Sequence, residues 1–226
     1  MLLRVRSWGK TSRMLTVHHL RRSQSERIVW LCEELGMAYE LKCYDRDPVT
    51  ILAPSEYKAL HPMGAAPVIT EDDLVLAESG AIVEYILVKH GGGRLAIAPS
   101  HPDYAQYLYW LHFANANLQS NMGRNMILHR LALPVDNAVQ QAARARLDSA
   151  LRYMNDRLGS AEFLAGSTFT AADIMTVFSV TTMRIYYPLD LAPFASIGNW
   201  LQRIGARPAY RHAMEKGDPG LTPMLA

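Results

Sequence analysis

Two serines stand at the point where a predicted strand runs into a predicted helix. The stretch from His18 to Gly36 reads HHLRRSQSERIVWLCEELG, which places Ser23 and Ser25 directly before a helical pattern. The first N–H groups of a helix are unpaired and its dipole is positive there, so a hydroxyl can help to bind an anion. The structural alternative is that Ser23 and Glu26 form a capping box. The two roles are compatible, because a capping serine can still donate its own hydrogen.

A proline at the start of a core strand is the second unusual feature. Pro67 lies in the stretch PMGAAPVI, and a proline cannot donate a hydrogen bond to a sheet. A cis Ala66–Pro67 bond in a tight turn would leave the N–H and C=O groups of Ala66 facing outward, able to pair with an extended peptide ligand. On spacing alone, an ordinary trans proline that opens an edge strand is favoured.

The third feature is an acid followed by a serine at another helix start. Glu78 and Ser79 open the stretch ESGAIVEYI. Unpaired N–H groups and the Ser79 hydroxyl suit a ligand carboxylate, and a nearby Glu could pair with a ligand ammonium. The alternative is routine N-capping by serine.

The elements that position these residues alternate between strands and helices in the first half of the chain. Apolar residues recur at i, i+3, i+4 and i+7 before Gly36, the expected helix stop. Tyr39, Leu41 and Cys43 alternate with polar residues, as in a half-buried strand. The predicted order is β-α-β-α-β-β-α, with strands at 14–20, 38–44, 67–70 and 74–78 and later helices at 55–60 and 79–90.

The second half shows helical patterns only. A glycine- and proline-rich stretch precedes it, and an apolar stripe then runs from Ala143 to Leu158. Thr170 and Asp173 form a capping box before an apolar segment, and a last helical segment is broken near Pro208. We therefore predict an α/β domain at 14–93, a linker at 94–101 and an all-helical domain at 102–226, preceded by a tail at 1–13.

Composition narrows the function classes. A net charge of +2 over 226 residues is too weak to indicate a nucleic-acid or membrane partner, and no apolar run approaches the roughly 20 residues of a membrane span. Cys32 and Cys43 fit two small buried residues in a reducing cytosol. The histidines lack metal-ligand spacing with acids or cysteines, so we predict no metal site. The basic tail lacks a secretory signal, and we expect a cytoplasmic protein.

Taken together, these stretches resemble the cytosolic glutathione transferase family. The β-α-β-α-β-β-α half, the serine after the first strand, HPMGAAPVI, ESGAIVEYI and the helical half with TFTAADI appear in the family's order and spacing. The resemblance implies a thioredoxin-like domain that binds glutathione and a helical domain with an apolar second-substrate pocket. It also implies a homodimer that uses glutathione as co-substrate, with no metal.

The resemblance also assigns residues. Ala66 would pair with the cysteinyl part of glutathione, Pro67 matches the family's cis-proline, and Glu78 and Ser79 match the pair that holds the γ-glutamyl group. Ser23 matches the serine of theta-like and many bacterial members.

Ser25 is the rival for the serine's role. We predict Ser23, because Ser25 would lie inside the first helical turn, where its hydroxyl is less free to reach a ligand. Many relatives carry Lys or Arg at the position of Ala65, so Lys58, His61 or an arginine would have to hold the glycyl carboxylate instead. Asn115 stands where related chains often carry an acid.

A single serine at a helix start can provide enough free energy to keep a bound thiol ionised near neutral pH. A free thiol has a pKa of roughly 8.5, and each unit of depression needs about 1.4 kcal/mol. One hydroxyl hydrogen bond to an ionised partner gives about 1.5–3 kcal/mol, and a helix N-terminus adds about 0.3–1 kcal/mol.

The predicted function is conjugation of the glutathione thiolate to small hydrophobic electrophiles. A glutathione-dependent peroxidase and a non-catalytic glutathione- or apolar-ligand-binding protein stay as alternatives. Tyr107, Trp110 and Phe113 are candidates for the second-substrate pocket, although helix packing could equally claim them.

Overall fold

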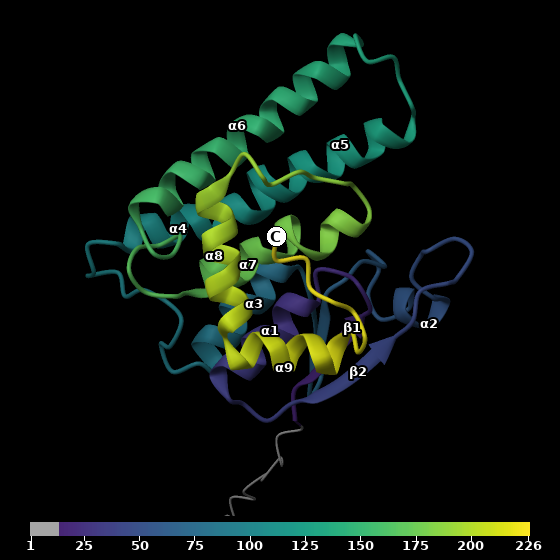
Figure 1. Ribbon diagram of the computed structural model, residues 1–226. Coiled ribbons are helices and arrows are strands. Elements are labelled where there is room, and N and C mark those ends of the chain that lie inside the picture. The colour runs from purple at the N-terminus through teal and green to yellow at the C-terminus, as the bar shows by residue number, and fades with distance from the viewer. Residues whose placement is uncertain (1–13) are drawn as a thin grey trace, which may run out of the picture.

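The computed structural model describes residues 14–226, so the predicted tail lies outside the described residues (Figure 1). The N-terminal part contains every strand of the described chain, and the part after it is helical. The first elements are β1 (Thr16–Leu20), α1 (Glu26–Leu35), β2 (Glu40–Tyr44), α2 (Ser55–Lys58), β3 (Val68–Glu71), β4 (Leu74–Ala77) and α3 (Ser79–Lys89). This order confirms the predicted fold class.

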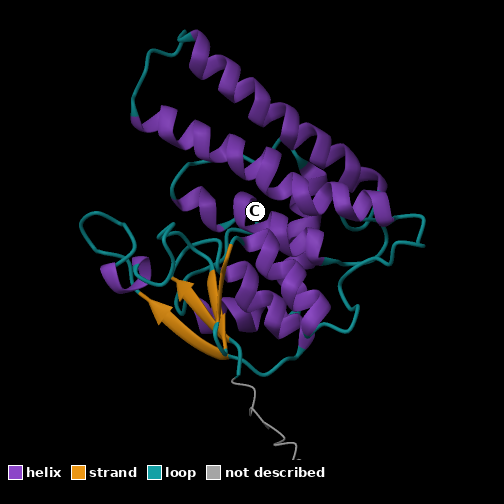
Figure 2. Ribbon diagram, turned by 180° about the vertical axis from the view of Figure 1, so that it is seen from behind, coloured by secondary structure: helices purple, strands orange, loops and turns teal. Residues whose placement is uncertain are grey.

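The strands form one mixed sheet in the order β2-β1-β3-β4. β1 runs parallel to β2 and antiparallel to β3, with Val17 opposite Leu41 on one side and Ile69 on the other. β3 and β4 form the predicted hairpin. In Figure 2 the strands stand between α2 on one side and the remaining helices on the other.

Two apolar clusters hold these layers together. A small cluster joins α2 to the sheet through Tyr57, Tyr44 and Leu20. The large cluster is continuous from the other face of the sheet, through α1 and α3, into the helical part. Because one core spans both parts, a side chain near β1 can contact residues far away in the sequence.

The helical part consists of α4 (Tyr104–Phe113), the π-helix η1 (Ala114–Gln119), α5 (Ser120–Arg130), α6 (Ala138–Ser160), α7 (Ala171–Val180), the 3-10 helix η2 (Thr182–Ile185), α8 (Ala195–Ala206) and α9 (Pro208–Gly217). The predicted stripe from Ala143 to Leu158 is buried along α6. The capping box of Thr170 and Asp173 begins α7, every residue of which is buried. Pro208 separates α8 from α9, and α9 packs against α1 (Figure 1).

The start of α1 differs from the predicted capping box. The helix begins at Glu26 with Ser25 as N-cap, and no side chain caps it. The Glu26 carboxylate instead accepts a hydrogen bond from Thr182 Oγ1 at 2.6 Å, and the contact with Ser23 runs through the Ser23 carbonyl. The capping-box prediction was wrong because the helical part covers this helix start and provides Glu26 with a tertiary partner. The end of α1 is as predicted, with Gly36 left-handed at φ 56°.

Among the described residues, no helix has the combination of length and apolar character that crossing a membrane requires.

Candidate functional site

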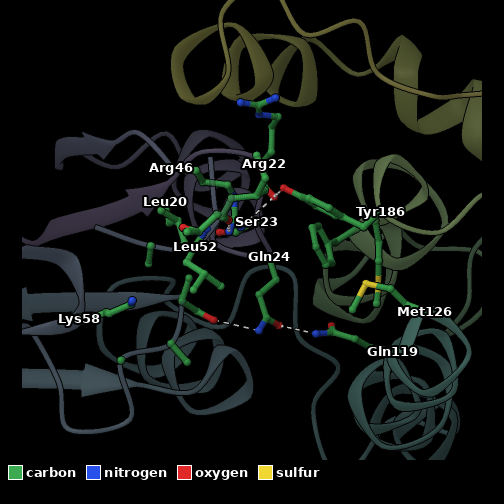
Figure 3. A pocket seen from close by; sticks show the side chains of 18 of the residues that line it. Leu20, Arg22, Ser23, Gln24, Arg46, Leu52, Lys58, Gln119, Met126 and Tyr186 are labelled. Carbon is green, nitrogen blue, oxygen red and sulfur yellow. Dashed lines mark hydrogen bonds between the residues drawn. The ribbon is translucent and has the colours of Figure 1, made fainter. Parts of the chain in front are cut away.

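A cavity of about 420 Å³ opens where β1 meets the helical part. One wall comes from the N-terminal part: the turn after β1 (Leu20, Arg22, Ser23, Gln24), the loop before α2 (Arg46, Thr50, Ile51, Leu52, Ala53), Lys58, and the segment Gly64, Ala65, Ala66. The opposite wall comes from the helical part: Gln119, Met126, Arg130, Phe178, Met183 and Tyr186. Figure 3 shows Ser23 and Gln24 between these walls, with Lys58 on one side and Met126 and Tyr186 on the other.

The two serines after β1 occupy different environments. Ser23 lines the cavity, whereas Ser25 does not line it and is fully buried. The Ser25 hydroxyl lies 2.8 Å from His19 Nδ1, and it accepts a hydrogen bond from the Leu20 amide at 3.1 Å. The hydroxyl oxygens of Ser23 and Ser25 are 2.8 Å apart. Of the two hydroxyls, Ser23 is therefore the one with access to a ligand, and Ser25 ties it to the end of β1.

The Ala66–Pro67 peptide bond is cis, as the resemblance implied. Ala66 lines the cavity, whereas Pro67 is buried behind it. The Ala66 carbonyl accepts a hydrogen bond of 2.9 Å from Gln24 Nε2 (Figure 3). This bond fixes the edge of the cavity to the turn that carries Ser23.

A buried arginine that sequence reasoning did not single out organises one side of the site. Arg27 has no exposed surface, and its guanidinium donates to Gln24 Oε1 at 2.9 Å and to Gln119 Oε1 at 2.7 Å. It also donates to Asn115 Oδ1 at 3.0 Å, and its Nε has no hydrogen-bond partner. Burial lowers the pKa of Arg27 to about 9. A buried cation held by neutral groups creates a positive potential beside the cavity.

Ser79 lies at the other end of the Arg27 network, and Glu78 directly precedes it in the chain. The Ser79 hydroxyl oxygen accepts hydrogen bonds from Asn115 Nδ2 at 2.9 Å and from Arg27 Nη1 at 3.4 Å, so its own hydrogen is available to a ligand. Glu78 is exposed and has a φ of 72°, a left-handed conformation that residues other than glycine rarely adopt. Neither residue lines the cavity that contains Ser23, but Ser79 belongs to the network that reaches it through Arg27 and Gln24.

The charge of the cavity wall is one-sided. The described residues that line it include four cations, namely Arg22, Arg46, Lys58 and Arg130, and no carboxylate. The Arg46 guanidinium donates to the backbone carbonyls of Arg21, Arg22 and Ile51, which fixes it at the rim. Lys58 is exposed at the opening. His61 does not line the cavity, and its Nδ1 accepts a hydrogen bond from the Met63 amide at 3.3 Å.

The three aromatic residues predicted for a second-substrate pocket lie elsewhere. Tyr107, Trp110 and Phe113 are buried on α4 and do not line this cavity. Trp110 stacks on Tyr153 of α6 with ring centroids 5.3 Å apart. The apolar side of the cavity comes instead from later segments of the helical part, which no local sequence pattern connects to Ser23.

Comparisons with known proteins show the family. Residues 13–88 match the family described as glutathione S-transferase, N-terminal domain, and residues 137–203 match the C-terminal domain of the same family. Glutathione S-transferase 3 from Schizosaccharomyces pombe is 33% identical over 218 residues, which cover 90% of this chain and 88% of that protein. The chain belongs to the glutathione S-transferase family.

Solved structures of other glutathione transferases share the fold. A glutathione S-transferase from Actinobacillus pleuropneumoniae superposes with a TM-score of 0.84 at 34% identity, covering 94% of this chain and 95% of that one. A family member from Pseudomonas fluorescens, solved with two glutathione bound, has a TM-score of 0.75 at 21% identity, covering 89% of this chain and 92% of that one. The predicted family and enzyme class are confirmed, and this chain is a glutathione S-transferase enzyme.

Proposed function

We propose that this transferase binds glutathione with its sulfur against Ser23 and joins the thiolate to small hydrophobic electrophiles. The observation that carries the proposal is the cavity itself. It holds an accessible hydroxyl and the Ala66 edge on one wall and apolar side chains on the other. Ser23 donates its hydrogen to the thiolate, and the positive end of α1 adds to the stabilisation.

The γ-glutamyl end of glutathione extends toward α3 in this proposal. Ser79 donates to the α-carboxylate, Glu78 pairs with the ammonium group, and the Ala66 backbone pairs with the cysteinyl residue next to Pro67. The left-handed backbone at Glu78 supports this role, because such conformations occur preferentially at ligand-binding positions. Ser25 contributes by holding Ser23 rather than by touching the ligand.

The glycyl carboxylate is assigned to Lys58, with Arg46 nearby. Both residues line the cavity, which favours them over His61. Glutathione carries two carboxylates and one ammonium group, and its thiolate form carries a further negative charge. A wall with four cations and no acid therefore attracts it electrostatically.

The second substrate is assigned to the helical wall. Phe178, Met183, Tyr186 and Met126 provide apolar and polarisable surface facing the sulfur position. We propose these residues in place of Tyr107, Trp110 and Phe113.

The domain boundary, the oligomeric state and the location in the cell are proposed from what the family implies. We propose that the boundary between the glutathione-binding domain and the helical domain falls at residues 94–101. We also propose that the enzyme is a cytoplasmic homodimer that acts without a metal.

The experiment that tests the function is a pH titration of the ultraviolet thiolate absorbance of glutathione on the protein. We expect a bound-thiol pKa well below the free value of roughly 8.5, together with conjugation of a generic aromatic halide. Binding without a depressed pKa would overturn the thiolate mechanism. Turnover of an organic hydroperoxide without conjugation would replace transfer by peroxidase activity.

A further inference from the structure

A line of hydrogen-bonding groups leads away from the cavity behind Ser23. Ser23 Oγ lies 2.8 Å from Ser25 Oγ, and Ser25 Oγ lies 2.8 Å from His19 Nδ1. On the far side of the ring, His19 Nε2 lies 3.2 Å from Asp218 Oδ2. All four side chains are at most 5% exposed. Of the four, only Ser23 lines the cavity.

The direction of these hydrogen bonds depends on the protonation of His19. Each hydroxyl donates one hydrogen and accepts up to two. If neutral His19 donates from Nε2 to Asp218, its Nδ1 accepts from Ser25, and Ser25 accepts from Ser23. If both ring nitrogens carry hydrogen, these hydrogen bonds reverse: His19 Nδ1 donates to Ser25, and Ser25 donates to Ser23. The Ser23 hydroxyl then donates into the cavity.

Backbone groups also contact the two serines, and the Leu20 carbonyl, 3.3 Å from Ser25 Oγ, is a more distant acceptor for the Ser25 hydrogen than His19 Nδ1 or Ser23 Oγ, each at 2.8 Å. The Leu20 amide donates to Ser25 Oγ, and the Ser25 amide donates to Ser23 Oγ at 3.2 Å. In the first arrangement Ser23 therefore keeps one acceptor position for a thiol S–H, and in the second every acceptor position on the two serines is filled. The two arrangements differ only by the movement of hydrogens along existing contacts.

We propose that His19 receives the proton of bound glutathione through the two serines, and that Asp218 positions the ring and stabilises the resulting cation. The thiol S–H bond breaks as its proton moves to Ser23 Oγ. The Ser23 hydrogen moves to Ser25 Oγ, and the Ser25 hydrogen moves to His19 Nδ1. The products are a thiolate that accepts from Ser23 and an imidazolium paired with Asp218. This inference rests on the proposed thiolate function.

Asp218 is held in place for this role. Its Oδ1 accepts a hydrogen bond of 2.9 Å from the Arg22 amide in the turn that carries Ser23. The neighbouring Gly217 lies so close to His19 that an added Cβ would stand 3.1 Å from Nε2. A carboxylate that orients a histidine, which in turn acts on a hydroxyl, is the arrangement of an activated nucleophile. Here the final nucleophile would be the sulfur of the co-substrate.

Other ionisable groups face His19 and Asp218 and belong to any pH profile of this site. Cys43 stands opposite His19 in the β1–β2 register. Arg21 donates to the Gly217 carbonyl at 2.7 Å, and buried Glu26 on α1 interacts electrostatically with Asp218. Variants of His19 must therefore be compared with the wild type at several pH values.

The decisive measurement counts protons on the wild-type enzyme. Glutathione is added at neutral pH, thiolate formation is followed by ultraviolet absorbance, and proton release is followed by calorimetry in buffers of different ionisation enthalpy. We expect thiolate to form with far less than one proton released per thiolate. Release of one proton into solution for each thiolate formed would overturn the proposed transfer to His19. Absence of thiolate would overturn the proposed function itself, and the proton transfer to His19 with it.

Variants locate the proton acceptor. We expect His19→Gln and Asp218→Asn to reduce bound thiolate at neutral pH by about 10- to 100-fold, a shift of about one to two pKa units. They should retain affinity for S-methylglutathione, which has no thiol proton to donate. His90→Gln is the matched control, since its ring pairs with Glu71 at 3.1 Å and does not line the cavity. Unchanged thiolate and proton counts in both site variants would overturn the proposal.

Discussion

Glu26 and Arg27 are consecutive residues with opposite charges, and both are buried, yet their side chains bond to different neutral partners. Glu26 accepts from Thr182, whereas Arg27 donates to Asn115 and Gln119. Burial raises the pKa of Glu26 to about 8 and lowers that of Arg27 to about 9. This arrangement is expensive for stability, because the Arg27 charge is desolvated without a direct counter-ion and burial keeps Glu26 protonated up to about pH 8.

Glu26 should make stability fall as the pH rises. The unfolded chain loses this proton near the ordinary value of 4.5 and the folded chain only near 8. The contribution of Glu26 to the free energy of unfolding is therefore complete below about pH 4.5. It falls by up to about 1.4 kcal/mol per pH unit as the pH rises to about 8. Glu26→Gln keeps a partner for Thr182 without titrating. We expect its unfolding free energy in urea to exceed that of the wild type increasingly from pH 5 to 8. A pH-independent difference would contradict this account.

Asn115 should determine how much the buried Arg27 costs in free energy of unfolding. Asn115→Asp gives Arg27 a carboxylate partner, so we expect the unfolding free energy to rise by about 1 kcal/mol or more. Asn115→Leu leaves polar groups of Arg27 and Ser79 without partners, and we expect it to lose about 2–3 kcal/mol. Thermal and urea unfolding of both variants, at equal protein concentration, would measure the effects. A loss of stability in Asn115→Asp would show that Arg27 needs no counter-charge.

Removing the Ser23 hydroxyl should weaken the thiolate rather than glutathione binding. Loss of a charge-assisted hydrogen bond of about 1.5–3 kcal/mol corresponds to a rise of about one to two units in the bound-thiol pKa. We expect Ser23→Ala to lower kcat about 10- to 100-fold at neutral pH, to recover at alkaline pH, and to leave KM for glutathione nearly unchanged. Ser149→Ala on α6 is the control. An unchanged rate would assign the role to other donors.

Lys58 should affect affinity and not chemistry. Lys58→Gln removes the cation proposed for the glycyl carboxylate, so we expect KM for glutathione to rise several-fold while kcat is unchanged. His61→Ala should have little effect, because His61 does not line the cavity. Raising the ionic strength should weaken glutathione binding less in Lys58→Gln than in the wild type. Equal effects of the two substitutions would reopen the assignment.

Asp173 should be indispensable for stability. Its carboxylate accepts hydrogen bonds from the Leu164 amide at 3.1 Å, the Thr170 amide at 3.0 Å and Trp200 Nε1 at 3.0 Å. Asp173→Ala leaves these buried donors without an acceptor, and each costs about 1–3 kcal/mol. We expect a loss of at least 3 kcal/mol in the unfolding free energy by urea titration. Exposed Asp156→Ala on α6 is the comparison and should change little.

Much of the fold could be predicted because its signals are local. The α6 stripe, the stop at Gly36 and the box at Thr170 each depend on residues within a few positions of one another. The cis bond before Pro67 was different, since spacing alone favoured trans and only the family resemblance indicated cis.

The site was less predictable because its partners come from distant segments. Arg27 stands at an ordinary helical position, and its burial follows from the η1 residues that cover it. The Ser23–Glu26 spacing suggested a capping box, but Thr182 provides a tertiary partner that competes for the carboxylate. No local pattern connects Phe178 or Met183 with the turn after β1.

Asp218 binds the turn after β1 through the Arg22 amide, across a sequence separation of 196 residues. The turn is among the first described parts of the chain to be synthesised, and Asp218 is among the last. During translation, Ser23 therefore emerges long before the carboxylate that anchors its turn. A nascent chain can form its sheet and α1 early, but the turn that carries Ser23 is anchored only after α9 has packed against α1.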